Sequence, residues 1–410
     1  MRLPDTFGAL REREFRLLFL GQAISWLGTG MVPLALAFAV LDVTHSVSDL
    51  GFVSAARALP LVVFLLAGGV FADRLPRRAV MIGADLVRLA SQGLLAGLLV
   101  AGVARLWEIV ALVTVLGAAT AFFNPAITGL SAQTVSEERL QEANALRSAS
   151  ASLGTVLGPS IAGVLVSTVG PGYALAVDAT TYAASAWFLA RLRLPPDERL
   201  PAQTMLHDLA EGWREFKSRA WLLWSNVHAL LANALVLAPY AVLGPAVAKR
   251  FLGGPGAWAI ISASFGVGSV LGGGVALRYK PRRPLFVGLA LTIVDTPLLA
   301  LLALHAHVAA IAAAAFAGGV SLIFLNTLWE TTIQEQVPPR LVSRITAYDL
   351  LASTIAYPLG LALAGVLAAH VLGVSGMLWL GAGTAAGLTL FIFCVPSVRA
   401  LESRRAQAGP

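Results

Sequence analysis

Several charged side chains lie inside stretches that are otherwise apolar, and these are the residues whose types could do chemistry. They are Arg57, Asp85, Arg88, Asp178, Asp295 and Glu330. Charged groups inside a membrane are costly and are usually functional. A carboxylate in such a place could take up a proton on one side of a membrane and release it on the other. The candidate groups for coupling a proton or a substrate are Asp295, Asp178, Glu330 and Arg57.

Each of these charges also has a structural interpretation. Asp85 and Arg88 are three residues apart on one helix face, so we expect them to pair with each other or with a neighbouring loop. Arg57 and Asp178 could pair across two helices. Asp295, in the stretch LTIVDTPLLA, has no obvious partner in the sequence. It is the deepest acid, and a shielded structural pair or a helix cap is its alternative role.

The elements that must position these charges are membrane-length helices. Of the 410 residues, 57% are hydrophobic and only 12% are charged, about half the charged share of a soluble domain. About 20 apolar residues cross the hydrocarbon layer as a helix, and only a helix or a closed barrel satisfies its own backbone there. The sequence predicts an all-α protein without a cleaved leader, whose twelve spans are 17–41, 51–72, 79–102, 107–130, 148–169, 173–194, 221–247, 257–277, 285–304, 308–329, 347–370 and 375–396.

The basic residues are distributed very unevenly between the loops. An even number of spans puts both termini on one side, and 24 of the 29 Lys and Arg residues lie on that side. Only Arg105, Lys249 and Arg250 lie on the other. By the positive-inside rule, we expect both termini in the cytoplasm of a cell whose cytoplasmic membrane holds the protein. The net charge of +7 is then a signal of topology and predicts no nucleic-acid partner.

Several chemistries find no support in the sequence. One cysteine, Cys394, and six scattered histidines give neither a disulfide nor the ligand spacing of a metal site. There is no phosphate-binding G-x-x-x-x-G-K-[ST] loop and no nucleophile constellation. We therefore expect no enzyme, no cofactor and no metal, with a proton gradient as the energy source. The expected partners are the lipid bilayer, protons and a small-molecule substrate, and the protein is expected to be a monomer.

A polar stretch divides the chain into two sets of six spans. We expect an N-terminal six-helix bundle over 1–194, a cytoplasmic linker over 195–220, a C-terminal six-helix bundle over 221–396 and a cytoplasmic tail over 397–410. The second part of the linker can form an amphipathic helix, or it is an ordinary surface linker. The apolar face of that helix would hold Leu209, Trp213 and Phe216.

The two halves repeat each other weakly. QTVSEERL at 133–140 matches QEQVPPRL at 334–341, and both follow the fourth span of their half. DRLPRR at 73–78 and RYKPRR at 278–283 both follow the second span. Parallel six-span repeats are typical of transporters in which two halves rock around a site near the membrane midplane.

The loop between the second and third spans resembles the cytoplasmic signature loop of the major facilitator superfamily. Pro76 stands where that family usually has glycine, which makes the loop stiffer. The resemblance implies a gating latch in which Asp73 pairs with an arginine and faces the eleventh span near Asp349. Topology anchoring alone would explain the arginines but not the acid. The latch residues are Gly69, Asp73, Arg74, Arg77, Arg78 and Asp349.

A second stretch, GTVLGPSIAG at 154–163, resembles the fifth-helix motif of exporters in that superfamily, with Ala162 where a further glycine is common. The resemblance implies a tight seam that limits leak, and ordinary packing of small residues is the alternative. The motif residues are Gly154, Gly158, Pro159 and Gly163. Together with RALPLVVFLLAGGVFADRLPRR and AVDATTYAASAWFLA, the stretch is similar to the drug, macrolide and siderophore exporters.

A substrate cavity of this fold would be mainly apolar, with a few polar groups. We expect its lining to include Gln22, Trp26, Asn124, Asn233, Tyr240, Asn326 and Trp329. Such a cavity suits amphipathic organic molecules. The expected function is proton-coupled export of drugs, macrolides or siderophores by alternating access. The alternatives are a facilitator or importer of another small organic solute, and a non-transporting membrane sensor or scaffold, which would need a soluble effector domain.

Overall fold

The computed structural model describes residues 8–74, 76–194 and 213–403. Within these ranges it leaves out the side chains of residues 65–74, 132, 137, 339, 340, 343, 344 and 347. The described residues form helices and no strand, which confirms the predicted all-α membrane fold. Eleven of these helical segments are long and apolar enough to cross a membrane. The remaining predicted span is α6, a helix of 20 residues that carries Asp178 and Thr181.

The first six predicted spans are single helices. The short 3-10 helix η2 (Gly8–Arg11) precedes them, and η3 (Glu137–Arg139) begins the fifth. Pro33, Pro60, Pro125 and Pro159 lie inside these helices without ending them, because neighbouring helices can satisfy the freed backbone groups in a membrane. The helices are α1 (Arg13–Thr44), α2 (Val47–Arg74), α3 (Arg77–Val100), α4 (Leu106–Gln133), α5 (Leu140–Thr168) and α6 (Pro171–Ala190).

Three of the later spans are broken. The seventh is α8 (Ala220–Ala232), the π-helix η4 (Asn233–Leu237) and α9 (Ala238–Phe251). The ninth is α11 (Pro284–Ala290), the 3-10 helix η5 (Leu291–Val294) and α12 (Asp295–Ala303). The eleventh is α14 (Pro339–Thr354) and α15 (Ala356–His370). The unbroken elements are α10 (Pro255–Arg278), α13 (Val308–Gln336), α16 (Gly373–Phe393) and the short α17 (Pro396–Arg399).

A proline accounts for each break. Proline has no N–H to donate to the carbonyl four residues earlier, and its ring crowds that carbonyl. Pro239 follows the π-helix, Pro297 follows the 3-10 helix, and Pro358 follows the break at Ile355. Each proline therefore frees a carbonyl inside the broken segment and allows the backbone to change its winding there. Segments of 3-10 and π winding inside helices are frequent at functional sites.

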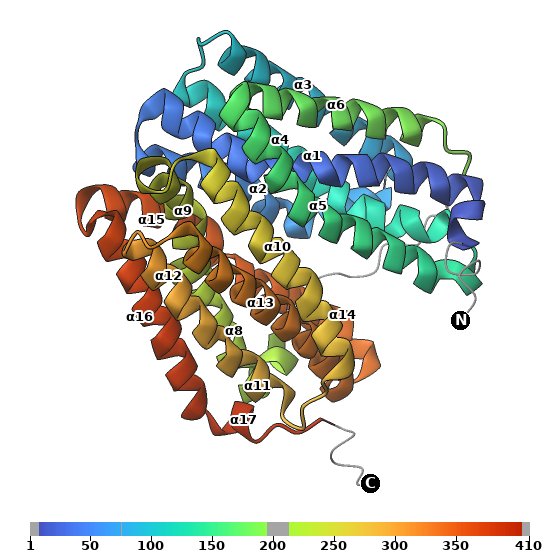
Figure 1. Cartoon of the computed structure of the whole chain (residues 1–410). Helices are drawn as coiled ribbons and strands as arrows, with labels where there is room; N and C mark the ends of the chain where they lie inside the picture. Colours follow the sequence, from blue (N-terminus) through green and yellow to red (C-terminus); the bar gives the residue numbers. More distant parts are fainter. Residues whose placement is uncertain (1–7, 75, 195–212, 404–410) are drawn as a thin grey trace. The chain divides into compact units, whose positions relative to one another are not determined.

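The chain divides into two compact units. Unit 1 comprises Met1–Pro201 with Gly254–Ala259, and unit 2 comprises Ala202–Gly253 with Ile260–Pro410. In unit 1, α1 packs against α5 and α6, α3 packs against α4 and α6, and α2 packs against α4 (Figure 1).

Unit 2 repeats this packing order. Its seventh span, made of α8, η4 and α9, packs against α15 and α16; α16 packs against α12; and α13 packs against α11 and α12. Backbone contacts at Gly268 and Gly319 join α10 to α13, as α2 joins α4 in unit 1. The internal repeat that the two short sequence matches indicated is therefore present in how the helices pack.

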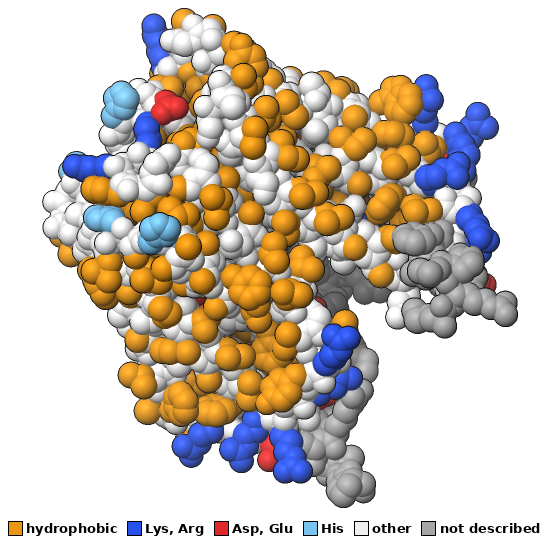
Figure 2. Space-filling model, viewed as in Figure 1, with side chains coloured by type: hydrophobic (Ala, Val, Ile, Leu, Met, Phe, Trp, Pro, Cys, Tyr) orange, Lys and Arg blue, Asp and Glu red, His pale blue; other side chains and the backbone are white. Residues whose placement is uncertain are grey.

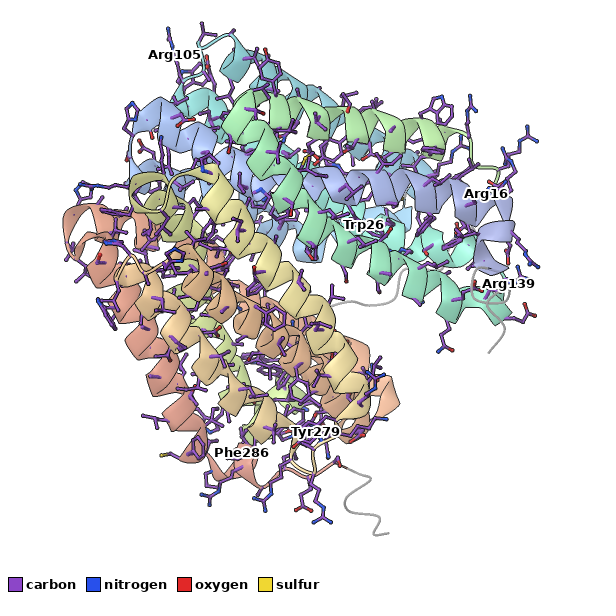
Figure 3. The ribbon with its side chains drawn as sticks, in the orientation of Figure 1. Arg16, Trp26, Arg105, Arg139, Tyr279 and Phe286 are labelled. Atoms are coloured by element: carbon purple, nitrogen blue, oxygen red, sulfur yellow. The ribbon has the colours of Figure 1, made fainter. Side chains whose placement is uncertain are left out.

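The surface has the pattern of a membrane protein. Hydrophobic side chains cover the flanks of the helices, whereas Lys and Arg gather near helix ends (Figure 2). Large apolar groups such as Leu277, 77% exposed, and Leu390, 66% exposed, face outward. Within unit 1, Arg16 and Arg139 lie at one end of the helices and Arg105 lies at the opposite end (Figure 3). This agrees with the sides to which the sequence analysis assigned them.

Candidate functional site

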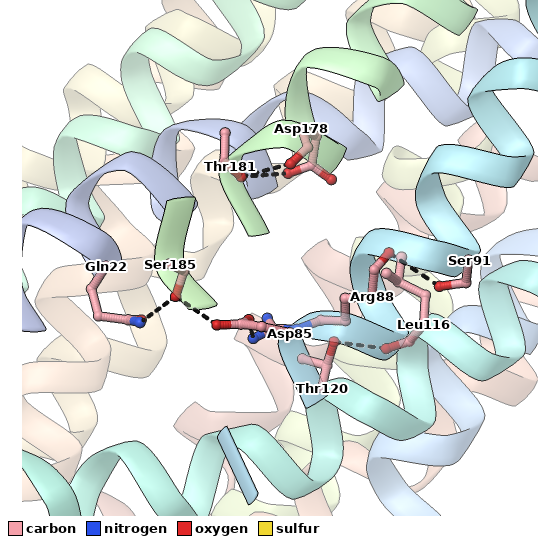
Figure 4. Close-up of polar contacts among 9 residues, drawn as sticks. All are labelled: Gln22, Asp85, Arg88, Ser91, Leu116, Thr120, Asp178, Thr181 and Ser185. Carbon is pink, nitrogen blue, oxygen red and sulfur yellow. Dashed lines mark hydrogen bonds and ion pairs between the residues drawn. The ribbon is translucent and has the colours of Figure 1, made fainter. Parts of the chain in front are cut away.

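The interior of unit 1 contains a buried ion pair. Asp85 and Arg88 on α3 are 0% and 4% exposed, and the guanidinium bonds to the carboxylate. This confirms the pairing that their spacing predicted. Ser185 on α6 donates a hydrogen bond of 2.6 Å to Asp85, and Gln22 on α1 donates one of 3.2 Å to Ser185 (Figure 4). The pair therefore links three helices.

Two aromatic rings complete the surroundings of Arg88. Its guanidinium carbon lies 3.9 Å from the ring centroid of Phe123 on α4 and 4.7 Å from that of Tyr182 on α6. Both distances are within the range of cation–π attraction. One carboxylate and two ring faces thus stabilise a single buried cation.

Asp178, on α6, lies in the same interior and is 0% exposed. Its carboxylate accepts a hydrogen bond of 3.0 Å from the Gln92 amide on α3. The expected partner Arg57 attracts Asp178 electrostatically, as Arg88 does, but no ion pair joins Arg57 to Asp178 among the described residues. The direct partners of this acid are therefore neutral groups: the Gln92 amide and the hydroxyls of Thr181 and Tyr182.

Two matching rows of polar side chains, one on α3 and one on α6, bring these groups together. Asp85, Arg88 and Gln92 are spaced i, i+3 and i+7 on α3, and Asp178, Thr181 and Ser185 are spaced in the same way on α6. Such spacing puts each set on one helix face. The two helices run antiparallel, so that the first residue of each row meets the last residue of the other. The sequence analysis missed Gln92 and Ser185, although the row of polar residues on an otherwise apolar helix was a signal that could have found them.

Gly28 on α1 provides the space that Asp178 occupies. A methyl group at Gly28 would lie 2.5 Å from a carboxylate oxygen of Asp178 and 2.5 Å from the Thr181 hydroxyl. We expect Gly28→Ala to displace Asp178 from Gln92 and to cost about 1–3 kcal/mol of stability. Thermal unfolding of the purified protein would measure the cost. Gly97→Ala on α3 is the control, because a methyl group there meets nothing within 4 Å. Equal melting temperatures for the two variants would contradict the expectation.

Asp295 is the acid of unit 2. It is the first residue of α12, immediately after η5, near the middle of the span Pro284–Ala303. Among the described residues it forms neither a hydrogen bond nor an ion pair. Its neighbours include Gly318 on α13, where a methyl group would lie 3.3 Å from a carboxylate oxygen. The sequence showed no obvious partner for Asp295, and the structure shows neither a hydrogen bond nor an ion pair for it among the described residues.

Asp349, which the latch interpretation placed opposite the loop after the second span, is hydrogen-bonded within unit 2. Its two oxygens accept hydrogen bonds of 2.9 Å from Asn226 on α8 and of 2.9 Å from the Trp329 indole on α13. The carboxylate therefore holds α14 to two helices of its own unit. Trp329, which we expected to line a cavity, donates this hydrogen bond to Asp349 and also makes an edge-to-face contact with Trp221. The candidate Glu330 next to it is exposed.

The remaining latch residues divide into two groups. The side chains of Gly69, Asp73 and Arg74 lie outside the described residues. Arg78 donates to the carbonyls of Leu189, at 2.9 Å, and Ala190, and so it satisfies the C-terminal end of α6. The Arg77 guanidinium packs against Gly129 on α4, where no side chain is in the way. Both arginines thus anchor the start of α3 within unit 1.

The fifth-helix motif forms a backbone-to-backbone crossing. Methyl groups at Gly154 and Gly158 would meet the carbonyl of Trp26 at 2.7 Å and the backbone of Gly30 at 2.5 Å, both on α1. Pro159 lies inside α5, and Gly163 is buried. The glycines therefore allow α1 and α5 to approach closely, which both interpretations of the motif require.

The other expected cavity residues are spread over both units. Gln22 is 2% exposed, and its amide donates a hydrogen bond to Ser185 in the interior of unit 1. Trp26 is partly exposed, and Asn124 and Asn326 are exposed. Asn233 begins the π-helix and donates a hydrogen bond of 2.8 Å to the Ser353 carbonyl, and Tyr240 packs beside Phe265. Tyr240 lies near the candidate acid Asp295.

Comparison with known proteins settles the family. The model of the Major Facilitator Superfamily matches residues 18–360. The chain belongs to this superfamily. It is 25% identical over 374 residues to macrolide efflux protein A of Streptococcus pyogenes, covering 87% of this chain and 90% of that protein. To the multidrug efflux pump Tap of Mycolicibacterium fortuitum it is 30% identical over 371 residues, covering 83% and 86%.

A third relative and a solved structure agree with this placement. The chain is 28% identical over 418 residues to the enterobactin exporter EntS of Escherichia coli, covering 97% of this chain and 94% of that protein. These relatives confirm the resemblance to drug, macrolide and siderophore exporters. The crystal structure of the nucleoside transporter NupG has a TM-score of 0.73 over 93% of this chain and 98% of its own, at 13% identity. That likeness confirms the twelve-helix fold, and this major facilitator protein is a multi-pass membrane transporter.

Proposed function

We propose that this transporter is a proton-coupled exporter of amphipathic small molecules such as drugs, macrolides or siderophores. The observation that carries the proposal is Asp295, a carboxylate in the middle of a membrane span that forms neither a hydrogen bond nor an ion pair among the described residues. A charge in that position is costly, and a proton removes it. Asp178 in unit 1, hydrogen-bonded to neutral groups and not ion-paired among the described residues, is the second candidate carrier.

Export as the direction of transport is supported by the relatives, whose names describe efflux of macrolides, efflux of multiple drugs and export of enterobactin. The bias of Lys and Arg supports a cytoplasmic location for both termini. One proton that enters down a potential of 100 mV supplies ~2.3 kcal/mol, enough for roughly 50-fold accumulation of an uncharged substrate. No further energy source is needed in this proposal, and the protein acts as a monomer in the cytoplasmic membrane.

Proton movement in inside-out membrane vesicles tests the proposal. A pH-gradient dye is followed while a lipophilic cation, a macrolide or a catecholate siderophore is added. We expect at least one compound to discharge the gradient with the wild-type protein and not with empty vesicles. Asp295→Asn should abolish the response, because an amide cannot carry the proton.

The variants Asp178→Asn and Glu330→Gln distinguish the other acids. A normal response from Asp295→Asn together with loss in one of these would keep the antiporter and move the coupling to that residue. No response to any compound from correctly folded wild-type protein would contradict proton-coupled export of these classes. Gene-dependent uptake of a solute would then favour the facilitator or importer.

A further inference from the structure

The loop between α10 and α11 repeats the loop between α2 and α3, but it lacks the acid of the first copy. DRLPRR at 73–78 aligns with RYKPRR at 278–283, so that Arg278 stands where the first loop has Asp73. The second loop carries four cations and no carboxylate of its own. Like charges so close together repel each other in a compact structure. An acid from another part of the chain would relieve that repulsion.

The segment after α16 supplies such an acid. The Glu402 carboxylate lies 3.9 Å from the Arg283 guanidinium, and the Ser403 N–H donates a hydrogen bond of 3.0 Å to the Arg282 carbonyl. In unit 1, Arg78 aligns with Arg283 and donates to the carbonyls at the end of α6. In both units, the last arginine of the loop therefore holds the chain at or just after the end of the sixth span of that unit.

The residues that lead to Glu402 are built into unit 2. Val395 and Val398 are buried in an apolar cluster with Leu285 of α11, and Leu401 packs against the same cluster. These three side chains on either side of the short helix α17 are spaced three residues apart, which suits one face of a helical turn. They fix the course of the segment, so that Glu402 is brought to the loop by packing and not by its charge alone.

Gln336, the last residue of α13, joins this segment to two further elements. Its side-chain amide donates a hydrogen bond of 2.9 Å to the Glu402 carbonyl. Its own carbonyl accepts one of 3.1 Å from Arg219, the residue before α8. Tyr279 of the loop stacks on Phe324 of α13, with ring centroids 6.2 Å apart, and lies at this end of unit 2 (Figure 3). Ends of α8, α10, α11 and α13 are therefore tied together around Glu402.

The segment before α1 makes a similar connection in unit 1. Glu12 accepts hydrogen bonds of 3.0 Å from the Ser136 N–H and 2.8 Å from the Ser136 hydroxyl, and it lies 3.9 Å from Arg139. Ser136 and Arg139 belong to QTVSEERL at 133–140, whose repeat at 334–341 contains Gln336. In each unit, a glutamate outside the spans thus bonds to a loop that the sequence repeats.

We propose that residues 395–403 form a strap, which supplies the missing acid to the loop 278–283 and holds this end of unit 2 together as one body. Two halves that rock against each other must each move as a body, and the strap makes the loop move with its bundle. Its last contacts are the weakest part, because the side chains of Arg283 and Glu402 are 51% and 41% exposed. Opening there releases the loop while Val398 stays buried.

Cleavage of the loop by chymotrypsin measures how firmly the strap holds it. The protease cuts after Tyr279, whose ring must first leave Phe324, and mass spectrometry identifies this cut in the full-length protein purified in a neutral detergent. Ser403→Pro removes the N–H that bonds to the Arg282 carbonyl. We expect it to speed the cut after Tyr279 about 5-fold, which corresponds to the loss of one hydrogen bond. Ser403→Ala is the matched control, because it keeps that N–H and should be cut as the wild type is.

Charge reversal tests the role of Glu402. Arg283→Glu and Glu402→Arg each place like charges together, and each should speed the cut after Tyr279 about 3-fold. The double variant restores an opposite pair, so its rate should return to that of the wild type. Arg282→Gln is the control for loss of a cation from the loop, because among the described residues the Arg282 side chain forms no ion pair.

Two results would overturn the strap. One is an equal rate of cleavage after Tyr279 in folded Ser403→Pro and Ser403→Ala proteins. The other is a double charge variant that is cut faster than both single variants. Melting curves identify any variant that has failed to fold, and if Ser403→Pro is one of these the charge variants decide. Neither test measures transport, so the result does not depend on the proposed export function.

Discussion

Asp85→Asn is expected to destabilise the protein by about 3–5 kcal/mol, because it leaves the Arg88 cation buried without its carboxylate. Both side chains are almost completely buried, so water cannot take over the lost contact. The rings of Phe123 and Tyr182 remain beside the guanidinium. Cation–π attraction is worth about 2 kcal/mol at a desolvated site, which is less than the lost pairing. Thermal and denaturant unfolding of the detergent-purified protein would measure the effect.

A double variant separates the lost pair from the unpaired charge. In Asp85→Leu with Arg88→Met, no charge remains in the interior, and such apolar replacement of a buried pair is often neutral or stabilising. We therefore expect the double variant to be more stable than Asp85→Asn. Glu215→Gln is the control, since it breaks the more exposed pair with Arg219 and should change stability by less than about 1 kcal/mol. A double variant as unstable as the single one would show that the contacts of Arg88 with the rings matter more than the pair.

The contrast between this pair and Asp178 shows what the sequence could predict. Asp85 and Arg88 are on one helix, where a spacing of three residues determines their proximity. Asp178 has its partner on another helix, and Gln92 becomes that partner only because α3 and α6 run antiparallel in a particular register. The sequence therefore favoured Arg57, an opposite charge at a similar depth. In the structure the hydrogen-bond partner is Gln92, which lies on the polar face of α3 opposite Asp178.

The helix breaks illustrate a second limit. Runs of apolar residues indicated the spans in the sequence, because each span requires about 20 such residues. These runs give no information on whether the helix winds as α, 3-10 or π. The sequence shows prolines inside many of the predicted spans. Helix breaks occur next to Pro239, Pro297 and Pro358, whereas the helices continue through Pro33 and Pro125. Whether a proline breaks a helix depends on how neighbouring helices satisfy the carbonyl that it frees. That information comes from packing and not from the local sequence.

Gly158→Leu should be at least as damaging as loss of the ion pair, at roughly 3 kcal/mol or more, because the added side chain meets backbone and not a movable side chain. The first added carbon would lie 2.5–2.8 Å from three backbone atoms of Gly30. Since α1 also packs against α6, moving it away from α5 would disturb the contact between Gly28 and Asp178. The predicted result is a large fall in melting temperature or failure to accumulate in the membrane.

A glycine in open surroundings provides the matched control. Gly83→Leu on α3 adds the same side chain where nothing lies within 4 Å, so it should fold normally. The smaller change Gly158→Ala then tests the role of the seam in limiting leak. If α1 and α5 must stay in contact to block protons, vesicles with Gly158→Ala should lose an imposed pH gradient faster than wild-type vesicles, even without substrate. If Gly158→Ala protein is stable and its vesicles keep the pH gradient as wild-type vesicles do, the seam does not limit proton leak. Close packing of small residues would then be the whole function of the motif.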